Sequence, residues 1–298
     1  MGSSSPRFRV PAIFSLAGLS ALIGLSAVTA LAAPQPKLAI VHPVFAQYED
    51  GSPMAKDYEY MPGESIFFSC QIDGFARSPA DKEESRKVFL SYRVEAKDSH
   101  GVLIQAAATG KEDSAVSPED KEWKPKIRET IVIPALADSG EYQLFIYVKD
   151  EVNLGTTEAH ATFRVKGREV TPSDTLTVRN FRFLRSEDES KPLQVAAYRP
   201  GDAVWARFDM TGYKTGDANR LDIGYGLSVL APDGKVAYSE PNAADQKEQP
   251  FYPQRYQPGV LSLNLAKDQP LGQYTIVLTV RDNVGKQTFE TREKFSVE

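Results

Sequence analysis

Apolar and polar residues alternate along two stretches of the chain that resemble each other. A period of two is typical of a strand whose two faces have different surroundings. Each stretch follows a glycine-containing turn and ends in an acidic turn, so the pattern predicts two equivalent strands. The residues on the apolar faces are Tyr142, Leu144, Ile146 and Val148 in the first stretch and Tyr274, Ile276, Leu278 and Val280 in the second.

The two strands belong to a longer internal repeat. Leu38–Ala46 corresponds to Leu176–Leu184, 138 residues later, and a Pro-Gly turn at Pro62 recurs at Pro200 with the same offset. The offset falls to 132 at the strands above, so the middle of the second copy is six residues shorter. A match that holds at several landmarks indicates a duplicated domain.

Each copy contains about seven short apolar segments separated by turn signals, which is typical of a β-sandwich. We therefore predict an all-β chain with two tandem immunoglobulin-like β-sandwich domains after an N-terminal signal peptide. The fourth strand is expected near Val102–Ala108 in the first copy and near Val236–Tyr238 in the second. The predicted parts are residues 1–32 as the signal peptide, 37–166 as domain 1, 167–175 as the linker and 176–298 as domain 2.

The turn before the first repeated strand, Asp138–Tyr142, resembles the entry to strand F of immunoglobulin-like domains. In that family a tyrosine bonds back to the preceding corner, and a cysteine two residues later pairs with one on strand B. Leu144 and Ile276 stand at the cysteine position here. The resemblance is thus to the immunoglobulin-like and fibronectin-III-like modules of exported bacterial proteins, and it implies a non-catalytic binding or scaffolding role.

The N-terminus has the pattern of a signal peptide. Arg7 and Arg9 precede an uncharged stretch from Val10 to Ala33, and small residues at Ala30 and Ala32 fit the cleavage rule. Cleavage after Ala32 predicts a periplasmic or secreted protein. The alternative is an uncleaved signal anchor in the inner membrane, because the apolar run is long enough to span a bilayer.

Charge and cysteine content narrow the function classes. The formal net charge of the 298 residues is −5, and no basic run interleaved with aromatic residues occurs, which argues against a nucleic-acid partner. Cys70 is the single cysteine, and it shares a strand face with Phe68 and Ile72. We expect a buried, inert thiol and no internal disulfide.

Catalytic constellations are missing from the sequence. The three histidines, His42, His100 and His160, stand apart from any recognisable nucleophile motif, and no P-loop or dinucleotide-binding fingerprint occurs. We therefore predict that the protein is not an enzyme and that it needs no cofactor.

Two acidic turns, one in each copy of the repeat, contain the candidate metal ligands, and the metal they would hold is calcium. Asp150 and Asn153 follow the first repeated strand, and Asp282 and Asn283 follow the second. Oxygen-rich loops can bind calcium if six to eight ligands converge. Asp and Asn also favour turns for conformational reasons, and that explanation is preferred here.

An aromatic segment near the end of the second copy is the best candidate for binding. It contains Phe251, Tyr252, Arg255 and Tyr256, and Trp123 in a charged segment of the first copy is a weaker candidate. Exposed Tyr and Arg provide a large contact area at low entropic cost, although the aromatic rings could instead pack under the edge of the sandwich.

The resulting prediction is an exported envelope protein that acts as a protein-binding or scaffolding module. The alternative is a carbohydrate-binding module, assisted by calcium. The expected partner is an envelope protein or a surface glycan, with no nucleic acid, and with membrane contact only if the signal segment stays uncleaved.

Overall fold

The structure, a computed structural model, describes residues 37–79 and 85–298. The predicted signal peptide, residues 1–32, lies outside the described residues. Apart from the short 3-10 turn Asp217–Asn219, the regular elements of the described residues are strands, and none of these residues forms a helix with the length and apolar character that a membrane crossing requires.

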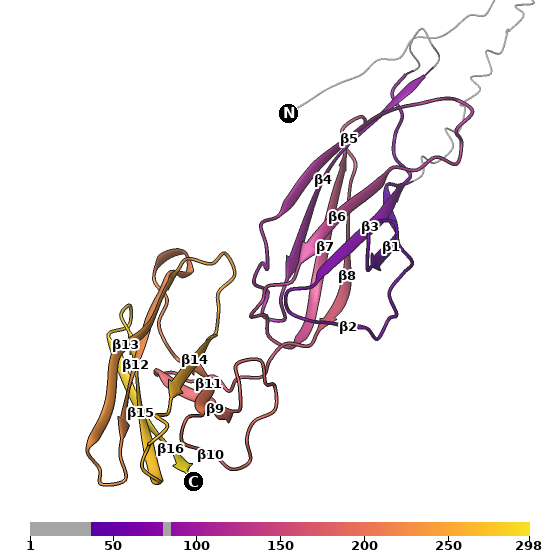
Figure 1. Ribbon diagram of the computed structural model, residues 1–298. Helices are drawn as coiled ribbons and strands as arrows, with labels where there is room; N and C mark the ends of the chain where they lie inside the picture. The colour runs from indigo at the N-terminus through magenta and orange to yellow at the C-terminus, as the bar shows by residue number, and fades with distance from the viewer. Residues whose placement is uncertain (1–36, 80–84) are drawn as a thin grey trace, which may run out of the picture. The chain divides into compact units, whose positions relative to one another are not determined.

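Residues 39–165 form a sandwich of two sheets (Figure 1). One sheet has the order β1-β3-β6 and the other has the order β2-β8-β7-β4-β5. The strands are β1 (Ala39–Ala46), β2 (Glu59–Tyr60), β3 (Ser65–Asp73), β4 (Arg86–Lys97), β5 (Ala108–Val116), β6 (Lys126–Val132), β7 (Gly140–Asp150) and β8 (Thr156–Val165).

Residues 177–297 repeat this arrangement in a second sandwich. Its sheets have the orders β14-β11-β9 and β10-β16-β15-β12-β13, which match those of the first sandwich strand for strand. The strands are β9 (Thr177–Leu184), β10 (Ala197–Tyr198), β11 (Ala203–Thr211), β12 (Leu221–Leu230), β13 (Val236–Glu248), β14 (Tyr256–Asn264), β15 (Gly272–Asp282) and β16 (Gln287–Val297). The all-β tandem sandwich is confirmed, whereas the domain boundaries at 166 and 176 stay a prediction.

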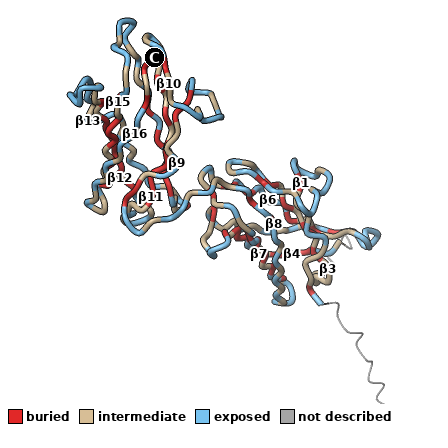
Figure 2. The backbone as a smooth tube through the Cα atoms, turned by 90° about the horizontal axis from the view of Figure 1, so that it is seen from below, coloured by how far each residue is buried: buried red, intermediate tan, exposed pale blue. Residues whose placement is uncertain are grey.

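The alternation in the sequence determines which side chains form the two cores. In Figure 2 the buried residues lie along the strands of both sandwiches. In β3, Ile66, Phe68, Cys70 and Ile72 are all buried, and they face the buried side of β7. A fully buried apolar side chain of this size stabilises a fold by about 2 kcal/mol, and Phe68→Ala would cost about 3–5 kcal/mol with the cavity included.

The corner before each repeated strand is fixed by its tyrosine. The hydroxyl of Tyr142 donates to the carbonyl oxygen of Asp138 at 2.9 Å, and that of Tyr274 donates to the carbonyl oxygen of Pro270 at 2.8 Å. The hydrogen bond expected from the immunoglobulin-like resemblance is therefore present in both copies.

A glycine closes β3 and its repeat β11 because the backbone turns into the left-handed region there. Gly74 has φ +66° and Gly212 has φ +77°. A Cβ atom at these positions would clash with the main-chain carbonyls of Lys37 and Thr175. Any other residue would thus be strained by its conformation and by its neighbour.

The position of the fourth strand in the first sandwich was predicted wrongly. The strand lies at β5, whereas Val102–Ala108 is largely irregular, because the side chain of Gln105 bonds to β6 of the other sheet. Its side-chain amide donates to the carbonyl oxygen of Thr130 at 3.3 Å and accepts from the N–H of Val132 at 2.9 Å. In the second sandwich the predicted strand begins at Val236 as expected and continues to Glu248.

Candidate functional site

The predicted binding segment is a loop between β13 and β14 whose main chain is held by its own sandwich. Thr211 Oγ1 donates to the carbonyl oxygen of Arg255 at 3.0 Å, and the Tyr213 hydroxyl donates to that of Gln254 at 2.7 Å. Asn219 Nδ2 donates to the carbonyl oxygen of Phe251 at 2.7 Å. Three side chains thus fix the path of the loop and the directions of its own side chains.

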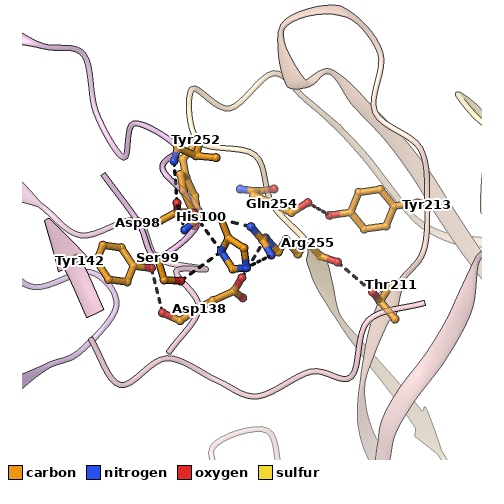
Figure 3. Close-up of polar contacts among 11 residues, drawn as sticks. Asp98, Ser99, His100, Asp138, Tyr142, Thr211, Tyr213, Tyr252, Gln254 and Arg255 are labelled. Carbon is orange, nitrogen blue, oxygen red and sulfur yellow. Dashed lines mark hydrogen bonds and ion pairs between the residues drawn. The ribbon is translucent and has the colours of Figure 1, made fainter. Parts of the chain in front are cut away.

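Tyr252 at the loop tip packs into the buried cluster of the first sandwich. Its hydroxyl donates to Asp98 Oδ2 at 2.9 Å (Figure 3), and only 5% of the residue is exposed. Burial, reinforced by the nearby Tyr142 and by the hydrogen bond to Asp98, raises the pKa of Tyr252. The phenol therefore stays protonated and acts as a hydrogen-bond donor.

Asp98 is buried at the end of β4, and its other carboxylate oxygen serves the adjacent turn. Asp98 Oδ1 accepts from the N–H of His100 at 2.9 Å and from that of Val102 at 2.8 Å. A buried carboxylate is costly unless its oxygens are hydrogen-bonded. Tyr252 completes that requirement from 154 residues further along the chain.

Arg255 contacts the same part of the first sandwich as Tyr252, at a more exposed position. Its Nε lies 3.1 Å from Asp138 Oδ2, and its Nη1 lies 3.2 Å from His100 Nε2. Because a guanidinium has no acceptor, His100 must accept through an unprotonated Nε2. The Arg255 side chain is 39% exposed, so solvent screens these contacts and Tyr252 is the stronger part of the joint. We call the contacts of Tyr252 and Arg255 with Asp98, His100 and Asp138 the interdomain joint.

The expectation of an exposed aromatic loop needs correction. Tyr252 and Tyr256 are buried, the latter within β14, because the joint and the strand take up their rings. Phe251, with 55% of its surface exposed, keeps a free ring. Trp123 is partly buried and packs edge-to-face on Phe75 within the first sandwich, at 5.9 Å between ring centroids. The structure thus brings Tyr252 and Arg255 together and leaves Trp123 elsewhere.

The candidate calcium ligands Asp150 and Asp282 are both buried, and they hold equivalent loops of the two copies. Asp150 accepts from the N–H groups of Ala76 at 2.6 Å and Val152 at 2.8 Å. Asp282 accepts from those of Lys214 at 2.9 Å and Val284 at 3.0 Å. The donors occupy matching positions of the repeat, so the two aspartates have the same structural role.

The neighbouring amides have protein partners as well. Asn153 Oδ1 accepts from the N–H of Gly155 at 2.8 Å, and Asn283 Nδ2 donates to Asp222 Oδ1 at 2.7 Å. Among residues 37–79 and 85–298, no group of three or more His, Cys, Asp or Glu side chains is arranged to hold a metal ion. The carboxylates of Asp150 and Asp282 and the side-chain oxygen of Asn153 therefore accept hydrogen bonds within the protein, and Asn283 is held through its side-chain nitrogen.

Comparison with known proteins leaves the family open. No protein-family model matches the chain, and no curated protein matches it. Among solved structures, the C-terminal domain of the Streptococcus agalactiae antigen I/II polypeptide BspA is 10% identical, with 87% of this chain and 100% of that chain covered and a TM-score of 0.28. The C-terminal domain of the Streptococcus pyogenes antigen I/II-family protein AspA is also 10% identical, with 89% and 99% covered and a TM-score of 0.29. At these TM-scores neither similarity supports an argument about fold or function.

Sequence reasoning placed Asp98 in an acidic turn at the end of its strand, and it missed that Asp98 and Asp209 are buried and hold segments together. Asp209 points to the outer face of β11 yet is fully buried, because Arg168 of the linker covers it with Nη2 at 2.9 Å from Asp209 Oδ2. Asn180 Nδ2 donates to the same oxygen at 2.8 Å. The alternation of β11 puts Asp209 on the outer face together with Arg207, so the sequence carried no local signal for its burial by Arg168.

Proposed function

We propose that the chain is a non-catalytic exported protein whose two sandwiches form a scaffold that binds another protein of the cell envelope. The observation that supports this most is the interdomain joint. It uses the aromatic and charged residues that sequence reasoning assigned to ligand binding, and it ties the second sandwich to the buried cluster of the first. Residues Pro36–Glu298 cluster as one compact unit.

The buried charged groups support a scaffold rather than a catalyst. Asp98, Asp150 and Asp282 each accept main-chain N–H groups, and Asp209 pairs with Arg168. Each of these carboxylates therefore stabilises the position of a loop or linker. A catalytic carboxylate would need a free oxygen that a substrate can reach, whereas Asp209 Oδ1, which lacks a hydrogen-bond partner, belongs to a fully buried residue.

Export is proposed from the N-terminal pattern, with a periplasmic or secreted location and with a signal anchor in the inner membrane as the alternative. In an oxidising compartment the single thiol does not form an intermolecular disulfide, because Cys70 is buried in the core of the first sandwich.

The partner is proposed to meet an edge of a sheet. Edge strands present unpaired main-chain groups, and an extended segment of another protein can add to them. In the second sandwich the edge strand β13 also exposes large apolar side chains, with Val236 63% exposed and Tyr238 48% exposed.

The test is affinity capture from envelope extract with residues 33–298 as bait, followed by binding measurements with the purified captured protein. Saturable binding of one protein by the bait supports the proposal. Capture of glycan or peptidoglycan fragments that a chelator releases would replace it with the carbohydrate-binding alternative. Turnover of a captured substrate would refute the non-catalytic role.

A further inference from the structure

The outer face of the β1-β3-β6 sheet carries a hollow of about 640 Å³. Its floor is the middle strand, β3, where the outward residues Phe67, Ser69 and Gln71 alternate with the buried ones of the core. Val44 of β1 stands on one side of Ser69, and Arg128 of β6 stands on the other. We call this space the β3 hollow.

A charged loop borders the β3 hollow. Asp50 lies in the loop that follows β1, and its carboxylate pairs with Lys126 and with Arg128, whose Nη2 lies 3.3 Å from Asp50 Oδ2. Because β3 lies between β1 and β6, these ion pairs span the outer face of β3. Asp50 and the neighbouring Glu49 balance the two basic groups, and Glu129 belongs to the core face of β6. The rim therefore favours a neutral ligand over an ion.

The second sandwich fills the equivalent space with an arginine. Arg207 stands 138 residues after Ser69, at the same place in the repeated sheet. Its Nη2 donates to the carbonyl oxygen of Glu187, which is the equivalent of Glu49 at the rim of the hollow, and its Nε is buried. The Arg207 side chain therefore reaches from the sheet to the loop, whereas the short side chain of Ser69 leaves that space open.

The floor and one wall of the hollow offer uncharged hydrogen-bonding groups. These are the hydroxyls of Ser69 and Thr130 and the amide of Gln71, and none of them is bonded to another group of the described residues. Each of the three can both donate and accept. Phe67, which is half-buried, adds an aromatic surface beside them. The lining thus combines one apolar ring with groups that match the hydroxyls of a ligand.

The main chain of the floor cannot accept an added peptide strand. β3 is paired on both sides, with β1 and with β6, and the main-chain hydrogen bonds of a sheet lie in its plane rather than above its face. A peptide in the hollow would therefore keep most of its own main-chain groups without partners. A saccharide has hydroxyls that both donate and accept, and the C–H face of its ring buries apolar surface on an aromatic side chain.

We propose that the β3 hollow binds a neutral saccharide, whose hydroxyls bond to Ser69, Gln71 and Thr130 and whose C–H face packs on Phe67. The volume of the hollow lies within the range of about 300–1,000 Å³ that is typical of ligand pockets. The site goes beyond the proposed function, because it adds a ligand of another class to the first sandwich, and this ligand is held without a metal.

The experiment titrates residues 33–298 with cellotriose, maltotriose and N-acetylated chitotriose and follows binding by calorimetry, with and without a chelator. We expect at least one of the three to bind saturably and equally well in both conditions. Ser69→Arg places the residue of the second sandwich into the hollow and should weaken that binding by about tenfold or more. The matched control Ser262→Arg makes the same change at an exposed position of β14 and should leave the affinity unchanged within about twofold.

A second variant removes a hydrogen bond without filling the hollow. Gln71→Ala should weaken binding by about three- to tenfold, and the amide NMR signals that the saccharide shifts should belong to β1, β3 and β6.

Three results would overturn the proposal. One is that none of the three saccharides binds with a dissociation constant below about 10 mM. Another is that Ser69→Arg binds as well as the parent, or that the shifted signals lie on other strands. The third is that sodium phosphate displaces the saccharide and is itself displaced by salt, which would assign the hollow to an anion. Because the titrations need no captured partner, their failure is distinguishable from failure of the proposed function.

Discussion

Tyr252→Phe tests whether the interdomain joint stabilises the first sandwich. The variant keeps the ring and removes the hydroxyl that donates to Asp98 Oδ2 at 2.9 Å. The Asp98 side chain is 2% exposed, so water cannot replace the donor without rearrangement. A hydrogen bond to a charged group contributes about 1.5–3 kcal/mol, and we expect a loss of about 2 kcal/mol.

The two tryptophans provide a reporter for each sandwich, since Trp123 lies in the first and Trp205 in β11 of the second. With Trp205→Phe as the background, the fluorescence of Trp123 follows urea unfolding of the first sandwich alone. A loss of about 2 kcal/mol with a slope near 2 kcal/mol per molar urea lowers its midpoint by about 1 M.

Tyr238→Phe is the matched control, because it removes a hydroxyl from an exposed tyrosine of the same sandwich and should change stability by less than about 0.5 kcal/mol. A double-mutant cycle of Tyr252→Phe with Asp98→Asn should give a coupling energy of about 1–2 kcal/mol. In the complementary Trp123→Phe background, Trp205 reports the second sandwich; if Tyr252→Phe lowers only that midpoint, the tyrosine stabilises its own sandwich and the interpretation of the joint is wrong.

Three further outcomes follow from the buried groups. Asp150→Asn and Asp282→Asn should each lower the free energy of unfolding by about 2 kcal/mol, as measured by thermal melts. If calcium instead raises the melting temperature of the parent and not of these variants, the two aspartates are metal ligands. Burial raises the pKa of Cys70 to about 12, so a thiol reagent at pH 8 should modify it only in denaturant, and fast labelling of the folded chain would contradict its burial. Burial also raises the pKa of Tyr142 and of Tyr198 to about 12. The free energy of unfolding that these phenols contribute is complete below the unfolded pKa near 10 and is lost as the pH rises to about 12, which absorbance at 295 nm and circular dichroism would show. An unchanged free energy of unfolding between pH 10 and 12 would contradict this prediction.

Local patterns in the sequence were sufficient to predict the strands and the cores. The alternation that ends at Val148 and Val280 identified the inner faces of β7 and β15, and the tyrosine corners followed from a single turn motif. β5 was placed wrongly because its charged residues, such as Lys111 and Asp113, conceal an edge strand whose face is only partly covered.

The joint could not be predicted from local patterns. An aromatic residue between prolines has the same appearance in a sequence whether it is exposed or buried, and the burial of Tyr252 depends on Asp98, 154 residues away. The role of Asp150 was closer to prediction, because Asp282 stands at the same place in the repeat. The main-chain donor at Ala76 that explains its burial is visible only once the strands are packed.

The distance in sequence between the two partners of the joint also sets an order in time. Asp98 is synthesised 154 residues before Tyr252, which at about 5–20 residues per second corresponds to about 8–30 s. During that interval the first sandwich can fold only with the outer oxygen of Asp98 open to water. We therefore expect the N-terminal sandwich to reach its final stability only after the C-terminal one has been made. In a chain truncated before Tyr252, the first sandwich should be degraded more easily than the same sandwich in the full-length chain.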